Sequence, residues 1–208
     1  MSQTSSLTVW QYLRSRDALL TIIMPMLIYN IAFWLGGAGV ALLTTAVYSA
    51  ILQYFSRQKG TLAIIALILM SGFSHYLYLK GYNLLGIEHE SVFLSISGAV
   101  SMVVVFGFYS LRGRPVIRAL AEQATPTLKT LPVYDTPLYS RVWHEISLVW
   151  ILVYLLKGIV IYSLSSSPQL PMDLIVLISG WPITLIMVTF SFQWPKYRWT
   201  SQADDEAP

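Results

Sequence analysis

Long runs of uncharged, mostly apolar residues recur along this chain, and they constrain its fold more than any other feature. A helix needs about 20 such residues to cross a bilayer. The runs are separated by short polar segments that contain glycine, proline or charged residues. The predicted fold class is therefore all-α, a polytopic membrane protein built as a bundle of six transmembrane helices. The predicted spans are 18–35, 38–55, 61–79, 91–111, 146–164 and 172–194.

The composition supports this interpretation. Of the 208 residues, 55% are hydrophobic and 11% are charged, whereas a soluble domain carries about 25% charged residues. This deficit excludes an ordinary cytosolic protein, a disordered chain and a nucleic-acid binder, despite the net charge of +3. Cysteine is absent, so the chain has no disulfide framework, no thiolate nucleophile and no cysteine-ligated metal.

The segments between the predicted spans are short, with one exception. Gly36 and Gly37 predict a tight turn, which makes a helical hairpin of the first two spans. The connector 112–144 is the long segment. Within it, Pro115 suits the first turn of a short helix that ends before Pro126.

The positively charged residues indicate the orientation. If the N-terminus lies in the cytoplasm, the outer loops hold only Lys80, and Lys157 lies within a span. By the positive-inside rule, both termini are then cytoplasmic, with 1–17 an amphipathic surface segment and 195–208 a tail. The other eleven of the thirteen lysines and arginines fall inside: Arg14, Arg16, Arg57, Lys59, Arg112, Arg114, Arg118, Lys129, Arg141, Lys196 and Arg198.

Small residues four positions apart mark two predicted helix-contact faces. Such stripes let the backbones of neighbouring helices approach closely in a membrane. The second span carries the first stripe and the fourth span carries the other. The predicted contact residues are Ala41, Thr45 and Ser49, and Ser91, Ser95 and Ala99.

Three polar residues within the spans are candidates for function, because polar groups are costly in a bilayer. They are Asn30, His75 and Lys157, all in the outer halves of their spans. One interpretation is an outward-facing polar vestibule in which Lys157 pairs with Asp173 or Glu88. The alternatives are a snorkelling Lys157, a His75 that bonds a backbone carbonyl at the interface, and an Asn30 that joins helices.

Arg112, Arg114 and Arg118 follow the fourth span. Arginines at a cytoplasmic membrane edge suit the phosphates of anionic lipids. The alternative is that they only set the topology. No known enzyme motif is present in the sequence. We therefore predict no catalytic residue, cofactor or metal site; the Glu-His-Glu run at 88–90 is a weak metal pattern because consecutive residues point apart.

Several segments resemble a known group. They are Pro25, Ile28 and Tyr29 in the first span, the run FGFYSLRGRP that leaves the fourth span, and LVWILVYLLK in the fifth. With the GGAG turn and the basic turn at 57–60, they make residues 17–194 similar to the bacterial membrane proteins related to intracellular septation protein A. The resemblance implies an inner-membrane protein associated with the cell envelope and division, and it carries over no catalytic residue.

These observations favour a non-enzymatic inner-membrane protein of cell-envelope biogenesis or division. It would act through membrane lipids and through a membrane-protein partner or a homo-oligomer, and not on nucleic acid. The second hypothesis is a small channel or transporter with a vestibule around Lys157. The third is a membrane enzyme that modifies a lipid or isoprenoid.

Overall fold

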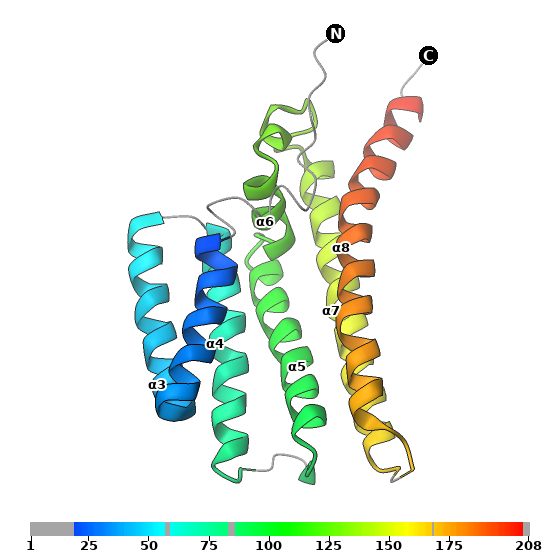
Figure 1. The fold of residues 1–208 in the computed structure, drawn as a ribbon. Coiled ribbons are helices and arrows are strands. Elements are labelled where there is room, and N and C mark those ends of the chain that lie inside the picture. The colour runs from blue at the N-terminus through cyan, green and yellow to red at the C-terminus, as the bar shows by residue number, and fades with distance from the viewer. Residues whose placement is uncertain (1–18, 57–58, 83–85, 168, 206–208) are drawn as a thin grey trace. The chain divides into compact units, whose positions relative to one another are not determined.

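Helices make up most of the residues that the computed structural model of the chain describes, which are 19–56, 59–82, 86–167 and 169–205. No strand occurs in these residues, so the all-α prediction is confirmed. Figure 1 shows the helices. Their order is η1 (Leu19–Ile23), α3 (Met24–Ser56), α4 (Lys59–Leu79), α5 (Glu90–Leu111), α6 (Val116–Ala124), η3 (Pro126–Thr130), α7 (Pro137–Ser165) and α8 (Met172–Asp205).

Four of these helices, α4, α5, α7 and α8, are long and apolar enough to cross a membrane. Two shorter apolar helices, Met24–Gly37 and Gly39–Leu52, make up most of α3. The chain therefore has the build of a helical membrane protein.

The predicted hairpin turn in α3 is confirmed. Gly37 has a φ of 76° and a ψ of −177°, a non-helical conformation that divides α3 into two helices. A side chain at this φ would be strained, whereas glycine adopts it freely. The chain reverses there, so that the two halves run back along each other (Figure 1).

The helix ends differ from the predicted span ends at two places. Helix α7 begins at Pro137, well before 146, because the Thr136 side chain accepts a hydrogen bond from the backbone N–H of Tyr139 and Pro137 occupies the first turn. Helix α8 continues past 194 to Asp205, with Pro195 inside it. Hydropathy marks where a helix leaves the bilayer, but local capping decides where the helix ends.

The connector contains the short helix that the prolines predict. Helix α6 begins at Val116, directly after Pro115, and ends at Ala124, before Pro126. Proline suits the start of a helix because its missing N–H would have no partner there.

The chain divides into two compact units. The first unit comprises 1–82 and 119–129, and it contains η1, α3 and α4. Ala41, Thr45 and Ala63 are buried in it. The Tyr48 hydroxyl donates to the carbonyl oxygen of Leu20 over 2.9 Å and so ties η1 to the second half of α3.

The second unit comprises 83–118 and 130–208, with α5, α7 and α8 as its long helices. His144 Nε2 lies 3.3 Å from the carbonyl oxygen of Ser110, which places the start of α7 beside the end of α5. The Ser91 hydroxyl donates to Asp173 Oδ1 over 2.6 Å, which brings the starts of α5 and α8 together. Helix α7 is therefore antiparallel to both of its neighbours.

The close packing at Gly72 in the first unit yields a stability prediction. A Cβ atom there would lie 2.7 Å from Leu42 Cδ2 and 2.8 Å from Tyr29 Cε2, so both side chains would have to shift. We expect Gly72→Ala to lower the free energy of unfolding by about 1–3 kcal/mol, measured by thermal denaturation in detergent. The matched control is Gly107→Ala, where nothing lies within 4 Å of the new Cβ; equal melting temperatures for the two variants would contradict the packing argument.

Candidate functional site

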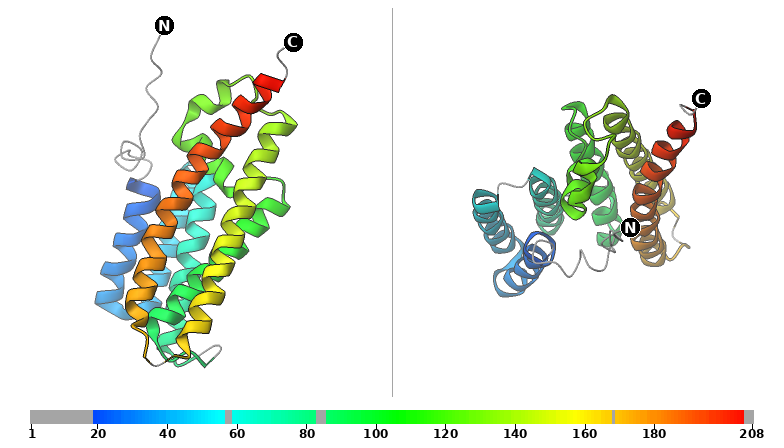
Figure 2. Two further views of the ribbon diagram at one scale, coloured as in Figure 1. Left: turned by 90° about the vertical axis from the view of Figure 1, so that its right-hand side faces the viewer. Right: turned by 90° about the horizontal axis from the view of Figure 1, so that it is seen from above.

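Side-chain hydrogen bonds join α7 to α8 along their length in the second unit. Trp150 Nε1 donates to Ser191 Oγ over 2.9 Å. One turn further along α7, the hydroxyls of Tyr154 and Thr184 lie 2.8 Å apart. Figure 2 shows the two helices running side by side. Because few competing partners exist inside a bilayer, these bonds align the two helices in one register.

A third contact in this series involves a carboxylate that the sequence analysis missed. Glu145 Oε2 accepts from Trp194 Nε1 over 2.9 Å, and Glu145 Oε1 accepts from Arg198 Nη2 over 3.0 Å. Trp194 and Arg198 are four residues apart on α8 and therefore share a face. That spacing is the signal available in the sequence, but the partner on α7 emerges only when the helices are paired.

Helices α7 and α8 also pack through aromatic rings beyond Glu145. The ring of Trp199 stacks on Tyr139 with centroids 5.5 Å apart and an interplanar angle of 13°. The same ring meets Trp143 edge-on at 6.2 Å. The helical extensions of α7 and α8 outside the predicted spans are therefore packed against each other.

Arg118 forms an ion pair and aromatic contacts within the protein. Its Nη2 lies 2.7 Å from Asp135 Oδ1, and its guanidinium carbon lies 5.0 Å from the ring centroid of Tyr139 and 5.8 Å from that of Tyr134. Its side chain is 22% exposed. Arg118 therefore has a structural role in the connector, and lipid binding by the three arginines stays a prediction.

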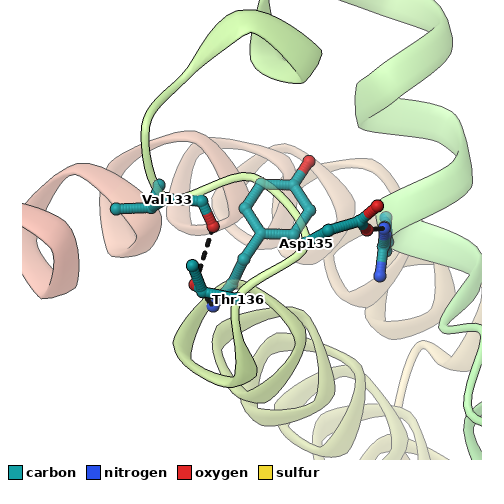
Figure 3. A network of polar contacts seen from close by, with 5 residues as sticks. Val133, Asp135 and Thr136 are labelled. Atoms are coloured by element: carbon teal, nitrogen blue, oxygen red, sulfur yellow. Dashed lines mark hydrogen bonds and ion pairs between the residues drawn. The ribbon is translucent and has the colours of Figure 1, made fainter.

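The turn that presents Asp135 to Arg118 is itself hydrogen-bonded. The Thr136 hydroxyl donates to the carbonyl oxygen of Val133 over 2.7 Å and accepts from the backbone N–H of Tyr139 over 3.2 Å. Figure 3 shows Val133, Asp135 and Thr136 in this turn. The backbone at Asp135 has a φ of 57°, a conformation that aspartate adopts more readily than most residues.

Arg112 and Arg114 are both exposed at the end of α5. The guanidinium carbon of Arg112 lies 4.7 Å from the ring centroid of Phe108. Arg112 therefore lies against an aromatic ring at the end of an apolar helix.

The two ends of the second unit differ in charge, although the basic end also holds Asp135 and Glu145, which pair with Arg118 and Arg198. The end where α5 finishes and α7 begins has exposed cations, while the described residues at the other end have acids and no lysine or arginine. The cations are Arg112, Arg114, Arg141 and Lys196, and the acids are Glu88, Glu90 and Asp173.

Lys157 lies on α7 among aromatic side chains. Its Nζ is 5.6 Å from the ring centroid of Tyr154, and that ring stacks on Trp150 at 5.6 Å. Asp173 is bonded to Ser91. The structure therefore does not bring Lys157 and Asp173 together, and within its described part no ion pair joins Lys157 to Glu88.

The other two predicted intramembrane residues belong to the first unit. His75 Nδ1 lies 3.1 Å from the Tyr29 hydroxyl, and the His75 ring stacks on Phe33 at 5.1 Å. This bond joins α4 to α3 through a hydroxyl. Asn30 Nδ2 donates to the carbonyl oxygen of Met26 in its own helix over 2.7 Å, so this bond does not join helices.

The residues of the first small stripe are buried in the first unit. Ala41, Thr45 and Ser49 are each at most 1% exposed, and the hydroxyls of Thr45 and Ser49 have no hydrogen-bond partner there.

The second small stripe lies in the second unit. Ser91 bonds Asp173, and the Ser95 hydroxyl is buried without a hydrogen-bond partner. Ala99 is 2% exposed, and its Cβ lies 3.6 Å from the position of a Cβ at Gly158. At this point α5 and α7 approach closely.

No family model, curated protein or solved structure matches this chain. The resemblance to relatives of septation protein A therefore stays a prediction made from the sequence.

The Glu145 contact leads to a coupling prediction. Glu145→Ala leaves both Trp194 Nε1 and Arg198 Nη2 without their acceptor, so we expect the protein to lose about 1–3 kcal/mol of stability. Arg198→Ala removes one of the same bonds. In a double-mutant cycle measured by thermal denaturation, the two losses should therefore be less than additive; fully additive losses would show that Glu145 and Arg198 are not energetically coupled.

Proposed function

We propose that this chain is a six-span protein of the bacterial inner membrane with both termini in the cytoplasm. It acts without catalysis, in cell-envelope biogenesis or division, by binding anionic lipids and a membrane-protein partner. The observation that carries the proposal is the pair of exposed guanidinium groups, Arg112 and Arg114, at the positively charged end of the second unit.

Helix lengths support six spans. The first half of α3, taken with η1, covers 19–37, and the second half covers 39–56. At about 1.5 Å per residue, each is roughly 27 Å long, close to the hydrocarbon thickness of about 30 Å. The two halves of α3 with α4, α5, α7 and α8 then make six crossings.

The charge distribution of the second unit supports the orientation. Arg112, Arg114, Arg141 and Lys196 share one end, and the acids of Glu88, Glu90 and Asp173 share the other. Basic residues are retained on the cytoplasmic side of bacterial membranes, so the basic end and the C-terminal tail face inward.

The two exposed arginines suit lipid phosphate by their chemistry. A guanidinium is planar and always charged, and it binds phosphate oxygens through two parallel N–H groups. Phe108 holds Arg112 beside the end of an apolar helix, where the phosphates of the inner leaflet are located under the proposed orientation.

The transport hypothesis has less support from the contacts. Two of its three intramembrane residues, Asn30 and His75, already take part in hydrogen bonds with Met26 and Tyr29. Such contacts are typical of side chains that stabilise helices and not of side chains that line an open vestibule.

The absence of cysteine allows a clean test of topology. Single-cysteine variants at exposed positions, Tyr82→Cys and Ser167→Cys for the outer side and Pro132→Cys for the inner side, can be labelled in whole spheroplasts with a membrane-impermeant maleimide. We expect the first two to be labelled at once and Pro132→Cys only after lysis. Labelling of all three from outside, or of Pro132→Cys alone, would contradict the proposed orientation.

Lipid binding tests the proposed activity. In native mass spectrometry of protein extracted from membranes, Arg112→Gln combined with Arg114→Gln should retain several-fold less phosphatidylglycerol and cardiolipin than the wild type, because two phosphate ligands are lost. Lys80→Gln, which removes one exposed cation from the first unit, is the matched control and should behave as wild type. Unchanged lipid retention in the double variant would overturn the lipid part of the proposal.

A further inference from the structure

The side chain of Lys157 points away from the nearer end of α7. The nearer end of α7 is Ser165, eight residues further on and about 12 Å away along the axis. The ammonium lies instead by the ring of Tyr154, three residues back toward the N-terminal end of the helix. Side chains on a helix lean toward its N-terminus, so snorkelling to the Ser165 end would oppose that lean.

The chain offers no carboxylate to this ammonium. Within the described residues, the carboxylate on α7 itself is Glu145, twelve residues and about 18 Å away, and Trp194 and Arg198 hold both of its oxygens. Asp173 accepts from Ser91. The other acids of the described residues lie at or beyond the ends of the apolar helices: Glu88, Glu90, Glu122, Asp135, Asp204 and Asp205. Asp17 and Glu206 lie outside the spans that the sequence predicts.

A second copy of the chain has the same composition and therefore supplies no acid at the depth of Lys157 either. A lipid phosphate is also a poor fit, because the phosphates lie near the helix end, about 12 Å from this residue, and the side chain turns the other way. An acidic side chain on a different transmembrane helix would meet the ammonium at its own depth.

The surface next to Lys157 is open to such a helix. Lys157 is half-buried, and it lies between a buried face that contains Tyr154 and Ile161 and an exposed apolar face. On that exposed face, Leu156 is 62% exposed and Val160 is 44% exposed. A neighbouring helix packed on Leu156 and Val160 would reach the ammonium directly.

We propose that the face of α7 formed by Leu156, Lys157 and Val160 docks a transmembrane helix of another membrane protein, and that this helix carries an aspartate or glutamate at the depth of Lys157. The inference rests on the proposed function, since it specifies the chemistry of the membrane-protein partner. A buried ammonium and a buried carboxylate each cost much to place in hydrocarbon alone, and pairing relieves both.

Designed transmembrane peptides test this docking face. The probes are fluorophore-labelled leucine–alanine helices with aspartate, leucine or lysine eight residues from the outer end, reconstituted with donor-labelled full-length protein in neutral phosphatidylcholine vesicles. Energy transfer measures association. We expect the aspartate peptide to associate about tenfold more tightly than the leucine peptide.

Variants of the protein identify the contact. Lys157→Leu should lower association of the aspartate peptide to the level of the leucine peptide, and Lys157→Glu should prefer the lysine peptide instead. Lys80→Leu removes a cation outside this face and should leave the preference for aspartate intact.

Two results would overturn the docking face: equal association of the aspartate and leucine peptides with wild type, or an undiminished preference in Lys157→Leu. Loss of phosphatidylglycerol from Lys157→Leu in native mass spectrometry, without any peptide preference, would assign the residue to a lipid instead. The lipid assay on Arg112 and Arg114 is independent of these peptides, so failure of the docking face is distinguishable from failure of the proposed function.

Discussion

A polar group inside hydrocarbon is costly unless the protein bonds it, because no water is there to do so, and many polar groups of the long helices are bonded in this way. The buried hydroxyls of Thr45, Ser49 and Ser95 are exceptions. Thr44, Ser101 and Thr189 each donate to a carbonyl oxygen one turn back in their own helix. Such bonds satisfy the hydroxyl without joining helices. The polar groups that do join helices are correspondingly few, and they decide which helices lie together.

In the second unit these joining contacts are concentrated between α7 and α8. Trp150 and Tyr154 reach Ser191 and Thr184 within the apolar region, and Glu145 holds two donors of α8 near its edge. Directional bonds at three levels favour one register of the two helices. The Arg118–Asp135 pair joins two parts of the connector at the same end.

The sequence predicted features that depend on local rules and missed those that depend on pairing. Apolar runs predict helices because the bilayer demands them, and Gly37 and Pro115 mark a turn and a helix start through their own backbone properties. The three arginines after the fourth predicted span predict a lipid contact for Arg118, whereas its ion pair with Asp135, seventeen residues away, is evident only in the structure.

The same limit applies to other long-range contacts. Glu145 is separated by 49 residues from Trp194, and Tyr29 by 46 from His75. Neither pairing has any signature in the residues that lie between the two partners. A prediction from sequence can therefore recognise that such polar groups need partners, but it cannot choose the partner until the helices have been placed side by side.

The extensions of α7 and α8 beyond the predicted spans also affect what surrounds the protein. Helix α7 adds nine residues before 146, about 13 Å of helix, and Trp199 of α8 is stacked against it on Tyr139. Aromatic stacking between the two helices restricts the motion of each relative to the other. Under the proposed orientation, it holds the end of α8 at a set height above the inner leaflet. A partner that binds the end of α8 would therefore meet it at a fixed distance from the membrane.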